Sequence, residues 1–188
     1  MNKNLKKLLS DIWIKEVKDK FLTGTITYER QLQGELYHVM KERVSYPYEI
    51  WIEPIIYLEK FNLNKVKPDI VITYDKYIHA VIELKFTPWF YSQYQGDLEK
   101  LNRFYKAAQS NAKVVLGWKP LHPNWQIQKE KGKQEYMMNK EMLAVFMVVS
   151  RPDSYALMKN EIEKFAPKNL LHFVGWINED STVEFKKK

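Results

Sequence analysis

The sequence contains no cysteine and no long hydrophobic run. The absence of cysteine excludes disulfide bonds and thiolate metal ligands, and it fits a reducing compartment. The first twenty residues, MNKNLKKLLSDIWIKEVKDK, are basic, but charged side chains interrupt their apolar positions too often for a secretory signal, and no later stretch has the length of a membrane span. We therefore expect a cytoplasmic protein with no membrane partner.

Arginine is also scarce, because only four of the 30 Lys and Arg residues are arginine. The net charge of +7 and the pI near 9.3 permit a polyanionic partner such as nucleic acid. The excess of lysine, with abundant isoleucine, asparagine and tyrosine, is equally well explained by the codon usage of an AT-rich genome. Residues 106–140 add a local excess, with seven lysines against two acidic residues. Charge alone leaves nucleic-acid binding open.

The length of 188 residues, with 45% hydrophobic and 28% charged residues, predicts one well-cored domain. Apolar periodicity and turn residues predict an N-terminal helix within residues 1–24, a core over 27–118, a basic loop or flap over 118–140, and a strand, a helix, a strand and a frayed tail over 141–188. Within the core, the expected order is a helix, three strands, a helix and a strand. Strands separated by helices predict an α/β fold in which a mixed sheet is covered on both faces.

Two of the core strands form an expected hairpin, KPDIVITYDKYIHAVIELKF (67–86), with a turn at or near residues 75–76. Asp69 opens the first strand, while Glu83 and Lys85 share one face of the second. Two carboxylates on neighbouring strands repel each other unless a cation lies between them. Oxygen ligands without His or Cys favour Mg²⁺ or Mn²⁺ over Zn²⁺. A lysine that points into the same space can orient an attacking water or stabilise charge on a phosphate.

This metal hypothesis places a demand on the register of the hairpin. A regular hairpin with a two-residue turn at 75–76 pairs Asp69 with Ile82 and sends Glu83 to the opposite face. The two carboxylates meet only if the loop has an odd length, such as residues 75–77, or if one strand contains a bulge. The sequence therefore predicts one of these two irregularities.

The PD at residues 68–69, followed after the hairpin by ELK at 83–85, resembles the PD-(D/E)xK signature of the restriction-endonuclease-like nuclease superfamily. The resemblance implies a restriction-endonuclease-like fold, whose core of helix, three strands, helix and strand is similar to the order expected over 27–118. It also implies that Asp69 and Glu83 bind Mg²⁺, for which Mn²⁺ can substitute, and that the lysine at the end of the signature, Lys85, is catalytic.

Many members of that superfamily add a glutamate from the first core helix, which is expected here from Thr27 to about Val44. The candidates Glu29 and Glu35 lie roughly 120° apart on a helix, so both cannot face one point. A carboxylate in the first turn is already explained by the helix dipole. Glu35 lies mid-helix beside Gly34, whose cost of about 1 kcal/mol relative to alanine is easier to understand if something approaches closely there. We therefore predict Glu35 as a metal ligand, direct or through water, with Glu29 as the alternative.

These expectations define two classes of function. The first is a Mg²⁺-dependent nuclease that hydrolyses phosphodiester bonds, most simply in DNA, and the sequence leaves a homodimer open. The second is a catalytically silent protein of the same fold that binds nucleic acid or a partner protein. A binding module has no need to keep a repulsive pair of acids, which favours the nuclease. Glu53, on the strand predicted over 50–59, is either a fourth acid of the site or an exposed residue.

Overall fold

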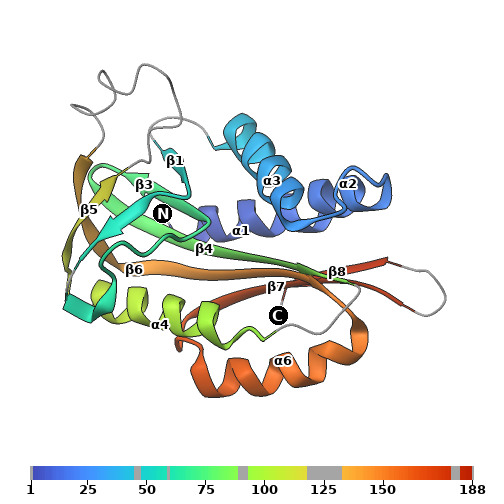
Figure 1. The fold of residues 1–188 in the computed structure, drawn as a ribbon. Coiled ribbons are helices and arrows are strands. Elements are labelled where there is room, and N and C mark those ends of the chain that lie inside the picture. The colour runs from blue at the N-terminus through green and yellow to red at the C-terminus, as the bar shows by residue number, and fades with distance from the viewer. Residues whose placement is uncertain are drawn as a thin grey trace.

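The chain folds as a mixed sheet with helices on both of its faces (Figure 1). The strands that the structure describes form one eight-stranded sheet, which confirms the predicted α/β class. Within the described part of the chain, no helix combines the length and the apolar character that crossing a membrane requires. The structure, a computed structural model, describes residues 2–44, 48–58, 60–88, 93–117, 133–178 and 183–187.

The predicted N-terminal helix and first core helix are both present. A continuous helical run consists of α1 (Asn2–Asp11), a π-helical stretch η1 (Ile12–Val17) and α2 (Lys18–Leu22), and it is followed by α3 (Glu29–Arg43). The apolar stripes of these helices are buried against one face of the sheet. Helical periodicity therefore located these elements to within a few residues.

The strand predicted over 50–59 is two strands, β1 (Glu49–Ile52) and β2 (Ile55–Tyr57). They lie at opposite ends of the strand path β1-β3-β4-β6-β5-β2, where β1 pairs with β3 and β2 pairs with β5, and the two remaining strands of the sheet branch off at β6. The break falls at Glu53, whose φ is 43°, and at Pro54, which cannot donate a ladder hydrogen bond. Because only Glu53 and Pro54 connect β1 to β2, the sheet curls so that these two end strands lie close together. A single 3₁₀ turn, η2 (Lys60–Asn62), follows β2.

The predicted hairpin is formed by β3 (Ile70–Tyr74) and β4 (Tyr77–Thr87), which pair antiparallel. After it come α4 (Gln95–Gln109) and β5 (Lys113–Gly117), both close to their predicted positions. The expected order of helix, three strands, helix and strand therefore becomes helix, four strands, helix and strand, because the first strand is divided at Pro54.

The loop or flap predicted over 118–140 is partly wrong. Residues 118–132 lie outside the described residues, but 133–140 belong to β6 (Lys133–Ser150), an 18-residue strand. The first part of β6 pairs antiparallel with β5, and most of its length pairs parallel with β4. The polar composition of 133–140 concealed the alternation in which Tyr136 and Met138 are buried.

The C-terminal region contains the predicted helix, α6 (Pro152–Phe165), and the predicted strand, β7 (Leu170–Ile177), which lies parallel to β6. The tail expected to fray is instead a strand over most of its length, β8 (Val183–Lys187), which pairs antiparallel with β7. Phe185 explains this correction, because its ring is buried and packs against Trp13 with the ring centroids 5.0 Å apart.

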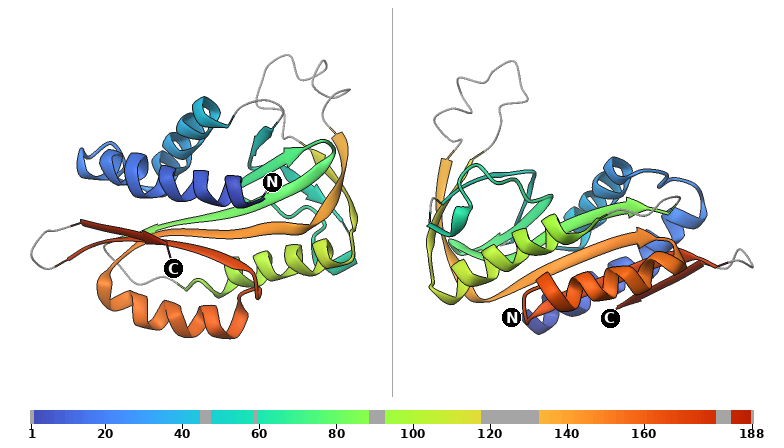
Figure 2. Two further views of the ribbon diagram at one scale, coloured as in Figure 1. Left: turned by 180° about the vertical axis from the view of Figure 1, so that it is seen from behind. Right: turned by 60° about the horizontal axis from the view of Figure 1, so that its bottom comes forward.

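The sheet separates two hydrophobic cores. One lies between the sheet and the helices α1 to α3, and the other lies between the sheet and the helices α4 and α6 (Figures 1 and 2). The alternating side chains of β4 contribute to both: Ala80 and Ile82 face the first core, and Val81 faces the second. Regular alternation would place Ile78 on the face of Ala80, but Ile78 lies in the second core because the strand is irregular between these two residues.

Candidate functional site

The irregularity in the hairpin is a β-bulge. Tyr74 stands opposite Tyr77 across a two-residue turn, and both turn residues have positive φ angles of 45° and 64°. The register then shifts, so that Thr73 pairs with Ile78 whereas Ile72 pairs with Ala80, and His79 is the extra residue. Of the two irregularities that the metal hypothesis allowed, the bulge is the one that the structure contains.

The bulge brings the two predicted acids together. Ile70 pairs with Ile82, so Asp69, one residue earlier, comes opposite Glu83 on the same face of the sheet. The Asp69 Oδ2 atom accepts a hydrogen bond from the backbone N–H of Leu84 at 2.6 Å. Only 1% of Glu83 is exposed, whereas Asp69 lies at an edge and is partly buried.

Carboxylates cap the edge of β4 beyond this pair. Since β3 begins at Ile70, no described strand pairs with that side of β4 after Ile82. The backbone N–H groups of Leu84 and Phe86 are satisfied by side chains instead, the first by Asp69 and the second by the Glu29 Oε2 atom at 3.3 Å. The first turn of α3 therefore supplies an acid to the same edge as Asp69.

Glu29, not the predicted Glu35, is the helix acid that the structure brings to Asp69. The carboxylate of Glu35 forms an ion pair with the Lys20 Nζ atom at 3.1 Å instead. Both glutamates border the apolar stripe of α3, but only the N-terminal turn of the helix reaches the edge of β4. Gly34, which had favoured Glu35, is exposed and has no atom within 4 Å of the position that a Cβ would take.

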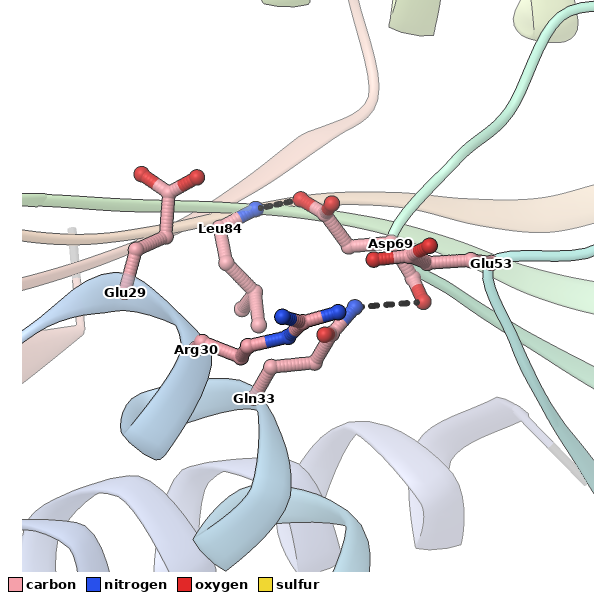
Figure 3. A pocket seen from close by; sticks show the side chains of 6 residues that line it. All are labelled: Glu29, Arg30, Gln33, Glu53, Asp69 and Leu84. Atoms are coloured by element: carbon pink, nitrogen blue, oxygen red, sulfur yellow. Dashed lines mark hydrogen bonds between the residues drawn. The ribbon is translucent and has the colours of Figure 1, made fainter. Parts of the chain in front are cut away.

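Asp69 lies in a pocket of about 130 Å³ between the start of α3 and the sheet (Figure 3). Gln33 fixes the backbone just before β3, because its Nε2 atom donates a hydrogen bond to the backbone carbonyl of Asp69 at 3.2 Å. Glu53, the fourth acid that the sequence offered, lines the pocket and faces Lys67 at 3.8 Å. Sequence reasoning missed Arg30 and Gln33, although the i,i+4 spacing places Gln33 beside Glu29 and the i,i+3 spacing places Arg30 beside Gln33. The lining residues are Glu29, Arg30, Gln33, Glu53, Asp69 and Leu84.

Two lysines and one further acid complete the surroundings of Glu83. The predicted Lys85 forms an ion pair with the Asp97 Oδ2 atom at 3.1 Å. Lys100, which the sequence analysis did not select, places its Nζ atom 2.5 Å from the Glu83 Oε2 atom and 3.6 Å from the Asp97 Oδ1 atom. Asp97 lies in the first turn of α4, whose N-cap residue is Tyr94, and its carboxylate faces both lysines. The i,i+3 spacing of Asp97 and Lys100 is the signal that could have identified the pair.

The two central carboxylates are poorly compensated. Burial, followed by repulsion from Asp69, raises the pKa of Glu83 well above its usual range, although Lys100 opposes this shift. Burial also raises the pKa of Asp69 to about 6, against the hydrogen bond from Leu84 and the attraction of Lys100. The Glu83 Oε1 atom is buried and has no hydrogen-bond partner among the described residues. Additional positive charge at this position would therefore stabilise the ionised pair.

The residues fit a magnesium or manganese ion in their chemistry but do not form a complete cage. Asp69 and Glu83 offer hard carboxylate oxygens, and the unpartnered Glu83 Oε1 atom is the donor that an ion would satisfy. No group of three or more His, Asp or Glu side chains in the described ranges is arranged to hold an ion. Mg²⁺ commonly keeps several waters and takes only one or two protein carboxylates, which such a pair can supply.

Comparison of the chain with protein-family models, with curated proteins and with solved structures finds no match. The chemistry of this site is therefore what indicates a function.

Proposed function

We propose that the protein is a divalent-metal-dependent nuclease that hydrolyses phosphodiester bonds, most simply in DNA. The observation that carries the proposal is the Asp69–Glu83 pair, two mutually repelling carboxylates held opposite each other by a bulge at the middle of a sheet. Such a pair destabilises a metal-free fold, so its presence is easier to explain by a function that uses it.

In this proposal Asp69 and Glu83 hold Mg²⁺ or Mn²⁺, and the ion, when bound, supplies Lewis-acid stabilisation of a phosphate and a more acidic water. Lys85 lies on the Glu83 face of β4 and keeps its charge, because the attraction of Asp97 outweighs the burial of the ammonium and raises its pKa. It is the group that would stabilise charge on the reacting phosphate. Arg30, at the pocket beside Asp69, is placed to contact a neighbouring phosphate.

A restriction-endonuclease-like fold is part of the same proposal. The PD at 68–69 comes directly before β3 and the ELK at 83–85 lies on its hairpin partner β4, after the helix α3 and before the helix α4 in the chain. The net charge of +7 is suited to a polyanionic substrate.

One observation favours the alternative, a silent protein of this fold that binds nucleic acid or another protein. The ammonium of Lys100 already forms an ion pair with Glu83, and Asp97 holds Lys85. A site whose charges are neutralised by its own lysines can persist without a metal.

The test is incubation of the purified protein with plasmid, linear duplex DNA, single-stranded DNA and RNA, in Mg²⁺, in Mn²⁺ and in EDTA. We expect metal-dependent cleavage that is abolished by Asp69→Ala and by Glu83→Ala. Lys85→Ala should lose turnover and retain Mn²⁺ binding. Glu135→Ala is the matched control, because Glu135 is exposed and pairs with Lys113 away from the site. Undiminished cleavage by the Asp69→Ala protein would refute this assignment, and binding without cleavage in every metal would favour the silent alternative.

A further inference from the structure

Lys100 is not part of the PD-(D/E)xK signature, yet its ammonium lies against the buried carboxylate of Glu83. Its Nζ atom lies 2.5 Å from the Glu83 Oε2 atom, and 18% of its side chain is exposed. Glu83 itself is 1% exposed, so the pair is desolvated. Removing one partner of such a pair leaves a buried charge without compensation, so Lys100 is the counter-ion that offsets part of the cost of burying the Glu83 carboxylate in the metal-free fold.

We propose that Lys100, whose ammonium holds the Glu83 Oε2 atom, competes with a divalent metal that takes the unpartnered Oε1 atom of the same carboxylate, and that Lys100 moves away from Glu83 when the metal binds. This inference rests on the proposed metal site at Asp69 and Glu83. It adds a regulatory property to that site: Lys100 lowers the metal affinity and keeps the carboxylates compensated while no metal is bound.

The competition follows from the charges at the site. An ammonium and a divalent cation that contact the same buried carboxylate repel each other at short range, in surroundings that screen charge poorly. Binding of a metal to the carboxylate therefore removes at least part of the attraction between Glu83 and Lys100. The free energy of breaking this pair is subtracted from the metal affinity, as in any binding that requires a prior rearrangement.

The structure also contains acceptors for the displaced ammonium. The Lys100 Nζ atom already lies 3.3 Å from the backbone carbonyl of Lys67 and 3.6 Å from the Asp97 Oδ1 atom. A small rotation of a long, flexible side chain can therefore move the charge from Glu83 to these oxygens without leaving it unpaired. Lys85 differs, because its ammonium pairs with Asp97 and not with either member of the acid pair.

The test is the affinity for Mn²⁺, measured by calorimetry and by the loss of the free Mn²⁺ signal in electron paramagnetic resonance. Lys100→Gln should bind Mn²⁺ at least tenfold more tightly than the wild-type protein. Lys85→Gln removes the same charge a short distance away and is the matched control, with an expected change of less than threefold. Lys113→Gln, at an exposed pair with Glu135, controls for net charge.

Three outcomes overturn the proposal: a Lys100→Gln affinity within threefold of the wild type, a weaker affinity, or an equal gain for Lys85→Gln, which would indicate only general electrostatics. If the wild-type protein binds Mn²⁺ and cleaves DNA but Lys100→Gln gains nothing, the nuclease proposal stands and the competition fails. If only Lys100→Gln binds Mn²⁺, the competition stands and the wild-type protein is not a metal-dependent nuclease. Absence of binding in both overturns the two together.

The variant must be folded for these readings to hold. Circular dichroism and thermal unfolding should show a folded Lys100→Gln protein that is less stable than the wild type in EDTA. Its Tm should rise more on addition of Mn²⁺ than that of the wild type. Lys100→Met, which keeps most of the apolar stem, provides the second variant, and a Tm rise in Mn²⁺ no larger than that of the wild type in both variants would contradict the competition.

Discussion

Replacing Asp69 by asparagine should stabilise the metal-free protein at neutral pH. Burial raises the pKa of Asp69 from 3.8 to about 6, so the folded state binds its proton more tightly than the unfolded state does. A group of this kind contributes stability that is fully present below pH 3.8 and is lost as the pH rises through about 6. At about 1.4 kcal/mol per pKa unit, the ionised carboxylate costs the folded state up to about 3 kcal/mol at pH 7.5.

Asparagine removes this charge and keeps the shape of the side chain. It also weakens one contact, because a neutral amide oxygen is a poorer acceptor than a carboxylate for the N–H of Leu84, at a cost of about 1 kcal/mol. The net gain at pH 7.5 is therefore about 2 kcal/mol. For a chain of 188 residues, this corresponds to an increase in Tm of about 4–8 °C.

The assay is urea unfolding followed by circular dichroism in EDTA, at several pH values from 4 to 8. The advantage of Asp69→Asn should be largest above pH 7 and should disappear, or become a small loss, near pH 4. Asp153→Asn is the control, because it removes an exposed pair with Arg151 and should change stability by no more than about 1 kcal/mol at any of these pH values. The reasoning fails if Asp69→Asn is no more stable than the wild type at pH 7.5, or if its gain is the same at pH 4.

Other substitutions test the corrections that the structure makes. Glu29→Gln should reduce the cleavage rate more than Glu35→Gln does. The Glu35 ion pair with Lys20 is partly exposed and should contribute no more than about 1 kcal/mol to stability in urea unfolding. Gly34→Ala should raise the Tm by about 2–4 °C with no change in cleavage, since the helix gains about 1 kcal/mol and the space is open. Gly175→Ala should lower stability by about 1–3 kcal/mol, because the new Cβ would stand 2.7 Å from the Phe185 ring; an unchanged Tm would mean that β8 does not pack there.

The central hairpin was predictable because geometry constrained it. Asp69 and Glu83 are fourteen residues apart, so the chemical hypothesis required either an odd-length loop or a bulge, and the structure contains the bulge, at His79. Nothing in the local sequence marks His79 as the extra residue, since bulge position depends on how both strands pair with their neighbours.

Elements stabilised by distant partners were less predictable. Residues 133–140 are polar, and they form a strand because β5 lies on one side and β4 on the other. Residues 183–187 are mostly charged, and they form a strand because β7 offers an edge and the Phe185 ring enters the core. Local composition does not reveal either set of strand partners, which is why these segments were assigned as loop or tail.

The choice between Glu29 and Glu35 shows a different limit. A helical wheel places both glutamates beside the buried stripe. The angle of roughly 120° between them excludes only that both face the same point. The decision depends on translation along the helix axis, which is fixed by where α3 crosses the free edge of β4. Helical periodicity contains no information about this crossing.

The charge arrangement around Glu83 argues that the site is retained for a function and not for stability. Replacing a buried ion pair with well-packed apolar side chains is often neutral or stabilising, so Glu83 and Lys100 are not needed to hold the sheet together. Even with Lys100 present, the pKa of Asp69 and that of Glu83 stay raised, which means that the lysine compensates only part of the repulsion between them. A cation fixed permanently on Glu83 would exclude a metal, whereas Lys100 has other oxygens within reach, the Lys67 carbonyl and the Asp97 Oδ1 atom, to which its ammonium can move. Lys100 therefore compensates Glu83 only in part and leaves this carboxylate available to a divalent ion.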